Sequence, residues 1–174
     1  GLRIETVQAD KCNFRLQEKV DFAFIMMGSL VVESNERFLR HLDSVAASLK
    51  EGGLYFIQNM GLDWTKDGKQ SWIMERGGIT VETSFEFHFK DILNQIGTEK
   101  MVLKVNDGGE IKEIVQEEDL KFIFPQEFKT LIKLNGKFEF LGWWEGTEST
   151  WYLDRSLEKA KTPNNINMVL LRRK

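Results

Sequence analysis

The apolar run from Phe22 to Met27 constrains the fold more than any other part of the chain. Such a run is typical of a β-strand that is covered on both faces. A helix is predicted next, because Ser34 can cap it, Glu36 suits its first turn and Gly52 lies just past its end. Its apolar stripe recurs at helical spacing at Phe38, Leu42, Val45 and Leu49.

A second strand is predicted from Leu54 to Gln58. Strand, helix and strand in this order form the unit that builds a parallel sheet. Ligands bind such sheets beyond the carboxyl ends of the strands, so the segment from Met26 to Ser29 is the first place to look for chemistry. A short strand is also predicted from Leu2 to Ala9, with Asp10 at its end.

Residues 64–124 follow a different pattern. Apolar side chains occupy every second position from Ile79 to Phe89, which predicts a strand with one buried face. Residues 106–109, Asn-Asp-Gly-Gly, predict the turn of an antiparallel hairpin. We therefore expect a single domain over residues 1–174 that contains an antiparallel β insertion at 64–124.

The last part of the chain predicts one helix and two strands. Pro125 suits the first turn of the helix and Asn135-Gly136 ends it. The strands are predicted at 138–144 and 167–171, as an antiparallel hairpin at the edge of the sheet.

Composition narrows the class of protein. The 174 residues carry a net charge of −3, so the chain lacks the excess of positive charge that is typical of proteins that bind nucleic acid. Arg172, Arg173 and Lys174 are predicted to form a solvated basic tip. The apolar runs are too short to cross a membrane, so no membrane partner is expected. The lone Cys12 excludes an intramolecular disulfide, which fits a cytoplasmic protein.

Two predicted strand ends carry groups that can hold a nucleoside. The Asp10 carboxylate can accept from an exocyclic amine while the next backbone N–H, that of Lys11, donates to a ring nitrogen, a pair of contacts that recognises adenine. A backbone carbonyl near Met26 can bind an ammonium group, and Gly28 permits a close approach.

Together these segments resemble the third strand, the fourth strand, and the fourth helix with the fifth strand of class I S-adenosylmethionine-dependent methyltransferases. The segments are Ala9-Asp10, Val20 to Leu30 and Leu49 to Leu54. The antiparallel insertion and the closing strands are also similar to small-molecule N- and O-methyltransferases of this superfamily. The resemblance implies an α/β fold with a Rossmann-like, mostly parallel sheet, and S-adenosylmethionine as cofactor.

The resemblance also implies roles for individual residues. Asp10 and the Lys11 backbone would meet the adenine, and the Met26 carbonyl would meet the methionyl ammonium with Met27 packing nearby. Ser29 would face a small-molecule methyl acceptor. From their place after strand ends or along the insertion, Asn59 and Trp64 can shape the pocket of this acceptor or simply pack. Asp21 opens a strand away from the ligand end and is interpreted as structural.

The glycine-rich loop and the acidic residue that hold the rest of the cofactor in this family have no counterpart in the sequence. Two strand–helix units, roughly 60–75 residues, are missing from the fold's beginning. We therefore expect the chain to be the C-terminal part of an enzyme, inactive alone, or a degenerate relative whose sheet is completed otherwise.

No residue is assigned as catalytic. His88 is a weak candidate for a base, His41 is interpreted as a packing residue, and Trp72 and Trp143 can shape a substrate pocket or simply pack. His, Cys, Asp and Glu show no metal-ligand spacing.

Two alternatives remain open. One is a non-catalytic interaction protein that forms a homodimer through the Ile79–Phe89 face. The other is an RNA methyltransferase, which the acidic composition makes less attractive.

Overall fold

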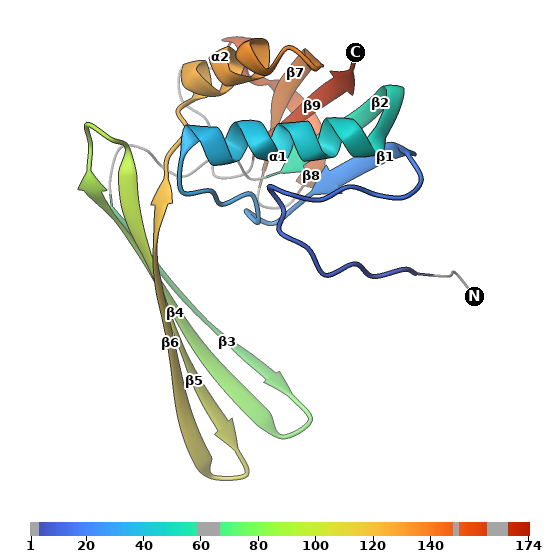
Figure 1. Ribbon diagram of the computed structural model, residues 1–174. Helices are drawn as coiled ribbons and strands as arrows, with labels where there is room; N and C mark the ends of the chain where they lie inside the picture. The colour runs from blue at the N-terminus through green and yellow to red at the C-terminus, as the bar shows by residue number, and fades with distance from the viewer. Residues whose placement is uncertain (1–3, 59–66, 148–149, 160–166) are drawn as a thin grey trace. The chain divides into compact units, whose positions relative to one another are not determined.

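A computed structural model describes residues 4–58, 67–147, 150–159 and 167–174 of the chain (Figure 1). The chain divides into two compact units, one made of residues 1–61 and 124–174 and the other of residues 62–123. In the described part of the chain, neither helix is long and apolar enough to span a bilayer.

The first unit holds two helices and a five-stranded sheet. The helices are α1 (Asn35–Ser48) and α2 (Pro125–Asn135). The strands are β1 (Val20–Ile25), β2 (Leu49–Gln58), β7 (Phe138–Thr147), β8 (Thr150–Ser156) and β9 (Asn167–Arg173). A short 3₁₀ turn, η1 (Leu157–Lys159), follows β8.

The five strands lie in the order β1-β2-β9-β7-β8. β1 and β2 pair in parallel, whereas the β2–β9, β9–β7 and β7–β8 pairs are antiparallel. The prediction of a mostly parallel sheet is therefore wrong for the described strands, since the predicted β–α–β unit supplies a single parallel pair. β9 lies inside the sheet instead of at its edge, because it pairs with β2 on one side and with β7 on the other.

Helix α1 begins and ends close to its predicted bounds. The Ser34 side chain accepts a hydrogen bond from the Arg37 backbone N–H at 3.3 Å, as expected of an N-cap. Phe38, Leu42 and Val45 are buried, and the Phe38 ring packs on Phe128 of α2 at 5.4 Å between centroids. The predicted apolar stripe is confirmed.

Gly52 and Gly53 belong to β2 and form an irregularity in its pairing with β1. Val20 pairs with Leu49 but Phe22 pairs with Leu54, so β2 carries extra residues between the two pairs. Gly52 has a left-handed φ of 77°, which favours glycine. A Cβ on Gly53 would lie 2.9 Å from the Lys50 carbonyl oxygen.

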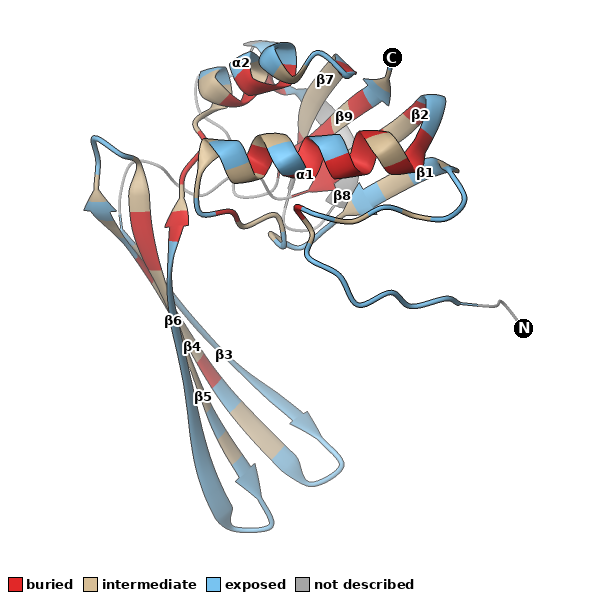
Figure 2. Cartoon of the chain, viewed as in Figure 1, coloured by how far each residue is buried: buried red, intermediate tan, exposed pale blue. Residues whose placement is uncertain are grey.

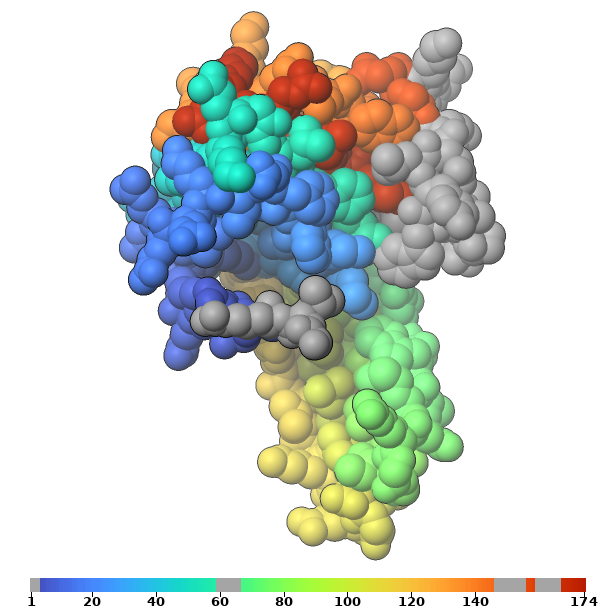
Figure 3. All heavy atoms as spheres, turned by 90° about the vertical axis from the view of Figure 1, so that its right-hand side faces the viewer, coloured from blue at the N-terminus to red at the C-terminus, as the bar shows by residue number. Residues whose placement is uncertain are grey.

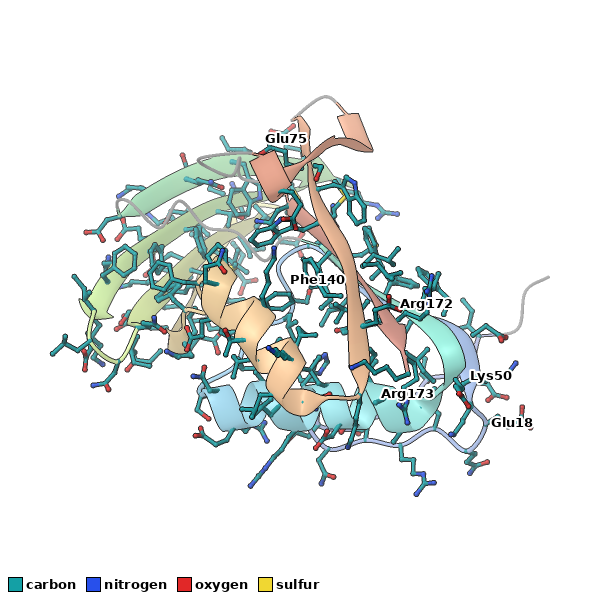
Figure 4. The ribbon with its side chains drawn as sticks, turned by 90° about the horizontal axis from the view of Figure 1, so that it is seen from above. Glu18, Lys50, Glu75, Phe140, Arg172 and Arg173 are labelled. Atoms are coloured by element: carbon teal, nitrogen blue, oxygen red, sulfur yellow. The ribbon has the colours of Figure 1, made fainter. Side chains whose placement is uncertain are left out.

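One face of the sheet is covered by the two helices. Paired residues point to the same side of a sheet, which places Tyr55, Ile57, Val169 and Leu171 on this face, all of them buried. Phe140, labelled in Figure 4, lies on the same face next to α2, where Lys129 reaches over its ring at 5.0 Å. The Arg173 side chain donates from Nε to the Ala46 carbonyl of α1 at 3.0 Å (Figure 4).

The opposite face lies open along β1. Phe22 and Phe24 stack on each other at 5.9 Å and remain 51% and 62% exposed. Leu54, Phe56 and Leu170 continue this face and are half-buried. The prediction that Phe22 to Met27 is covered on both faces is wrong for the described residues, because both helices lie on the Tyr55 side.

A further prediction fails in the first unit, because the described residues of the predicted strand at 2–9 form no strand and are exposed. Arg172 and Lys174 are exposed, as predicted for a solvated basic tip. Arg172 also pairs with Glu139 at 3.2 Å, and the half-buried Arg173 donates to backbone carbonyls. Asp21 forms an exposed ion pair with Lys50 at 2.8 Å, and its interpretation as structural stays a prediction.

The second unit is a four-stranded antiparallel sheet in sequential order. Its strands are β3 (Gly68–Arg76), β4 (Ile79–Asp91), β5 (Ile96–Asp107) and β6 (Glu110–Lys121). The predicted hairpin is confirmed, because Asp107 pairs with Glu110 across Gly108 and Gly109. A cluster of Phe87, Phe89 and Phe122 closes over Gly97, and Phe87 and Phe122 are buried.

Candidate functional site

The segment after β1 forms a tight turn with two left-handed residues. Met27 has a φ of 57° and Gly28 a φ of 69°. The Ser29 backbone N–H donates to the Met26 carbonyl at 3.2 Å, which closes the turn. A non-glycine residue with this backbone costs energy, so a position such as Met27 is a useful pointer to function.

Gln58 holds this turn against the end of β2. Its side chain is buried, and its Oε1 accepts a hydrogen bond from the Met27 N–H at 3.2 Å. The Met27 side chain itself is 76% exposed and points away from the interior. That Met27 packs beside a ligand stays a prediction, whereas a hydrogen bond fixes its backbone.

Asp10 lies in a turn of its own instead of at a strand end. Its carbonyl accepts from Asn13 N–H at 2.9 Å, and its Oδ1 accepts from Cys12 N–H at 2.8 Å. The Arg37 guanidinium donates to both carboxylate oxygens, from Nη1 to Oδ2 at 2.9 Å and from Nη2 to Oδ1 at 3.0 Å. These bonds, chiefly the one from Arg37, lower the pKa of the Asp10 carboxyl, so it is an acceptor at neutral pH.

A polar stripe along α1 fixes the segment that follows Asp10. The N–H groups of Phe14 and Leu16 donate to the hydroxyls of Ser44 and Ser48 at 3.3 and 3.2 Å. Arg37 binds Asp10 and His41 binds the Lys11 carbonyl, so they belong to the same row of polar residues on the helix. The row is spaced by four, three and four residues, as expected for one side of a helix: Arg37, His41, Ser44 and Ser48. We call these four residues the polar stripe.

His41 is the buried member of the polar stripe whose ring joins the Asp10 loop to the core. Its Nδ1 lies 2.8 Å from the Lys11 carbonyl oxygen and its Nε2 lies 2.7 Å from the Tyr55 hydroxyl. A carbonyl only accepts, so Nδ1 carries the hydrogen, and in the neutral ring Nε2 accepts from Tyr55. Burial lowers the pKa of His41, which favours this neutral form. His41 is therefore a packing residue, as predicted, and it anchors the Lys11 backbone.

The two segments belong to the same end of α1. The turn at Met26–Ser29 leads directly into the α1 N-terminus, whose first turns supply Arg37 and His41. Since α1 follows the carboxyl end of β1, Arg37 in the first turn of α1 ties the Asp10 loop to the helix that comes after the Met26 turn. That the two segments face one ligand stays a prediction, and Asp10 lies in a turn without a strand.

The other predicted site residues are dispersed. Ser29 is exposed in the turn, while Asn59 and Trp64 lie outside the described residues. Trp143 packs on the helix-covered face, with Lys129 Nζ 4.5 Å from its ring centre, and Trp72 and His88 belong to the second unit. Among the described residues, no group of three His, Cys, Asp or Glu side chains is placed to hold a metal ion.

Sequence reasoning missed Gln58 and Arg37. Gln58 is a polar residue at the end of an otherwise apolar strand, which is a signal of a polar partner beyond that end. Arg37 opens a polar series at helical spacing, parallel to the apolar stripe. Both signals were present in the sequence, but neither identifies its partner without the fold.

No protein-family model and no curated protein sequence matches the chain. Solved structures match its fold. An S-adenosylmethionine-dependent methyltransferase from Clostridium acetobutylicum matches with a TM-score of 0.73 and 16% identity, over 98% of this chain and 65% of that protein. An amino pentose methyltransferase from Micromonospora echinaspora, involved in calicheamicin biosynthesis, matches with a TM-score of 0.66 and 14% identity, over 95% of this chain and 63% of that one.

A sugar N-methyltransferase from Streptoalloteichus sp. matches with a TM-score of 0.69 and 15% identity, over 96% of this chain and 61% of that protein. The chain thus spans less than two thirds of the length of each of these proteins. At such identities the likeness is one of fold. The chain has the mixed α/β fold of class I S-adenosylmethionine-dependent methyltransferases over the part that it covers, with a second, antiparallel sheet.

Proposed function

We propose that this chain is the C-terminal part of an enzyme that transfers a methyl group from S-adenosylmethionine to a small-molecule acceptor. The observation that supports the proposal is the methyltransferase-like fold, in which hydrogen bonds hold the backbone of both candidate segments, Asp10–Lys11 and Met26–Ser29. The solved structures of similar fold include methyltransferases of sugars, which supports a small-molecule acceptor.

The residues present suit the two polar ends of this cofactor. Each carboxylate oxygen has two lone pairs, so Oδ2 of Asp10 can accept from an adenine amine while it also accepts from Arg37. The Met26 carbonyl accepts from Ser29 and has a second lone pair for the methionyl ammonium. When bound, the cofactor supplies an electrophilic methyl group, and the chain's own contribution is to position it.

The open face of the five-stranded sheet supports the proposal that further strands and helices complete the fold. β1 pairs only with β2 among the described strands, and Phe22 and Phe24 are exposed beside it. Covering each phenylalanine would contribute roughly 1.5–3 kcal/mol. A strand added to β1 and a helix laid over these rings are what residues upstream of Gly1 would supply, with residues 1–174 forming one partial domain.

Calorimetric titration of S-adenosylmethionine into the complete polypeptide, with its upstream segment, tests the proposal. We expect binding that Asp10→Ala weakens at least about tenfold, because one charge-assisted hydrogen bond to adenine is lost. Asp21→Ala is the matched control, since Asp21 is also paired with a cation but lies at the other end of β1. Absence of binding by the complete polypeptide would refute the proposal.

A non-catalytic, dimeric interaction protein is the second candidate. It is favoured by the apolar face of the β3–β6 sheet, which carries the exposed residues Trp72 and Met74. Dimerisation without any cofactor binding by the complete polypeptide would favour it.

An RNA methyltransferase is disfavoured further by the engagement of Arg172 and Arg173 within the fold. Binding to RNA that weakens steeply with salt would favour this alternative again.

The setting of the enzyme is proposed to be cytoplasmic. Cys12 is buried and carries a free thiol, and burial raises its pKa, so it is an unreactive packing residue. This is the state expected of a lone cysteine in a reducing compartment.

A further inference from the structure

Gln58 is the last residue of β2, and its side chain is buried although it is polar. β1 and β2 run in parallel with Ile25 opposite Ile57, so Gln58 lies level with Met26, the first residue after β1. Burying an amide is costly unless its polar atoms are hydrogen-bonded. Its Oε1 accepts from the Met27 N–H at 3.2 Å, and this bond ties the end of β2 to the turn after β1.

The hydrogen bond from Met27 to Gln58 acts on one particular peptide plane. The Met26 carbonyl and the Met27 N–H belong to the same peptide group, which is trans. In a planar trans peptide the carbonyl and the N–H point in opposite directions. Because Gln58 accepts from the N–H, the Met26 carbonyl points away from Gln58. The bond therefore fixes the direction of the carbonyl that is proposed to accept from the methionyl ammonium.

The turn has a competing arrangement that this bond opposes. Met27 and Gly28 both have left-handed φ values, 57° and 69°, as in a type I′ turn. A left-handed backbone is costly for a residue with a side chain, so rotation of the Met26–Met27 peptide plane would relieve Met27. The Ser29 N–H donates to the Met26 carbonyl at 3.2 Å, which is at the long end of the usual range. We expect the bond to Gln58 to decide between the two orientations of the plane.

The turn is accessible, whereas Gln58 is not. The connection from β1 to α1 is mostly exposed or half-buried (Figure 2), and Met26 and Met27 are 38% and 76% exposed. Figure 3 shows atoms of the N-terminal part of the chain, in blue, at the surface of the first unit. Gln58 is only 2% exposed, so it can act on a ligand only through the Met27 backbone.

We propose that Gln58 is a positioning residue for the amino-acid end of the cofactor. It holds the Met26–Met27 peptide plane so that the carbonyl faces the methionyl ammonium. The inference rests on the proposed function, since it assigns a role within the same site. Tyr55, on the same strand, is linked through His41 to the Lys11 carbonyl and so to the proposed adenine end. β2 is therefore connected separately to each proposed end of the cofactor.

Two ligands distinguish these ends in calorimetric titrations of the complete polypeptide. S-Adenosylhomocysteine and methylthioadenosine share the adenosine and the thioether sulfur, but only the first carries an amino acid. Gln58→Met keeps the size of the side chain and removes the acceptor. It should weaken S-adenosylhomocysteine about tenfold or more, because a hydrogen bond to a charged ammonium is misdirected, and methylthioadenosine less than about twofold. Tyr55→Phe is the contrasting variant, which should weaken both ligands by the same factor.

Gln58→Glu tests the chemistry of the acceptor. A carboxyl group accepts a hydrogen bond in either protonation state, so this variant should bind S-adenosylhomocysteine within about threefold of the unchanged protein. A merely structural role of Gln58 would weaken both ligands alike. That result, or no weakening of either ligand in Gln58→Met, would overturn the inference and leave the proposed function standing. Failure of the unchanged polypeptide to bind either ligand would refute both.

Hydrogen exchange of the Met27 N–H tests the bond without any variant or ligand. The Met27 side chain is exposed, so an amide without a partner there would exchange rapidly with water. Since the N–H donates to Gln58, we expect NMR to show exchange slowed by about tenfold or more relative to an unprotected amide. An unprotected Met27 amide would overturn the inference.

Discussion

The hydroxyl of Tyr55 and Nε2 of His41 lie 2.7 Å apart in the interior of the first unit, and the other nitrogen of the same ring binds the Lys11 carbonyl. A residue of the inner strand β2 is thereby linked through one side chain to the loop that carries Asp10. The position of the proposed adenine-binding loop thus depends on the core of the fold.

Removing the His41 ring is expected to destabilise the protein. His41→Phe keeps the volume but leaves the Tyr55 hydroxyl and the Lys11 carbonyl without their partner, which costs about 2–4 kcal/mol. Urea unfolding followed by circular dichroism measures the change. His88→Phe serves as the control, because His88 is exposed on the second unit and its substitution should change the free energy of unfolding by less than about 0.5 kcal/mol.

The same residue predicts a pH dependence. Burial lowers the pKa of His41 below its ordinary value of 6.5, so the unfolded chain binds a proton that the folded chain does not. Stability contributed by His41 is present above about pH 6.5 and is lost as the pH falls toward the lowered folded pKa. The difference in unfolding free energy between the unchanged protein and His41→Phe should shrink between pH 7 and pH 5. A constant difference would contradict the neutral ring.

Arg37 is expected to set the ionisation of Asp10. Arg37→Gln removes the largest cause of the lowered Asp10 pKa, so that pKa should move back up toward its ordinary value. The carboxyl carbon shift of Asp10 in an NMR titration reports this directly. Arg40→Gln on the same helix is the control, and an unchanged Asp10 titration in Arg37→Gln would show that the ion pair is not formed in solution.

Gly97 is expected to tolerate no side chain. A Cβ at this position would lie 2.1 Å from the Phe122 ring and 2.7 Å from Phe87, so Gly97→Ala should destabilise the second unit by about 1–3 kcal/mol through overpacking. Gly68→Ala is the matched control, since nothing lies within 4 Å of its Cβ position. Equal thermal midpoints for the two variants would show that the phenylalanine cluster is not packed as described.

Phe24 reports whether a further layer covers the open face. Its side chain is 62% exposed in the described structure, where Phe24→Ala should matter little. If upstream residues cover this face, the substitution in the complete polypeptide should cost about 3–5 kcal/mol. Chemical denaturation of the complete polypeptide measures it, and a loss below about 0.5 kcal/mol would mean that the face stays open.

The sequence predicted those elements whose signals are local. Ser34 capped α1, the alternation from Ile79 to Phe89 marked β4, and Asn106 to Gly109 formed the hairpin turn. Each signal lies within a few residues of the structure that it produces. The mixed α/β class followed from their order along the chain, whereas the expectation of a mostly parallel sheet did not hold.

The failures concern what lies next to an element in space. The run from Phe22 to Met27 gives the strand but not the neighbours that cover it, so the exposed face of β1 was not foreseen. The strand predicted at 2–9 has no partner among the described strands, and a strand without a partner leaves its backbone groups to water. The turn at Asp10 is local, but its bond to Arg37 and the contacts of the polar stripe join residues distant in sequence, so the sequence alone does not reveal them.

A crystal structure of the complete polypeptide with S-adenosylhomocysteine tests the central claim most directly. We predict that the adenine amine lies within hydrogen-bonding distance of Asp10 Oδ2 and the amino-acid ammonium within that distance of the Met26 carbonyl oxygen. A ligand bound elsewhere, or one that reaches neither group, would contradict the account.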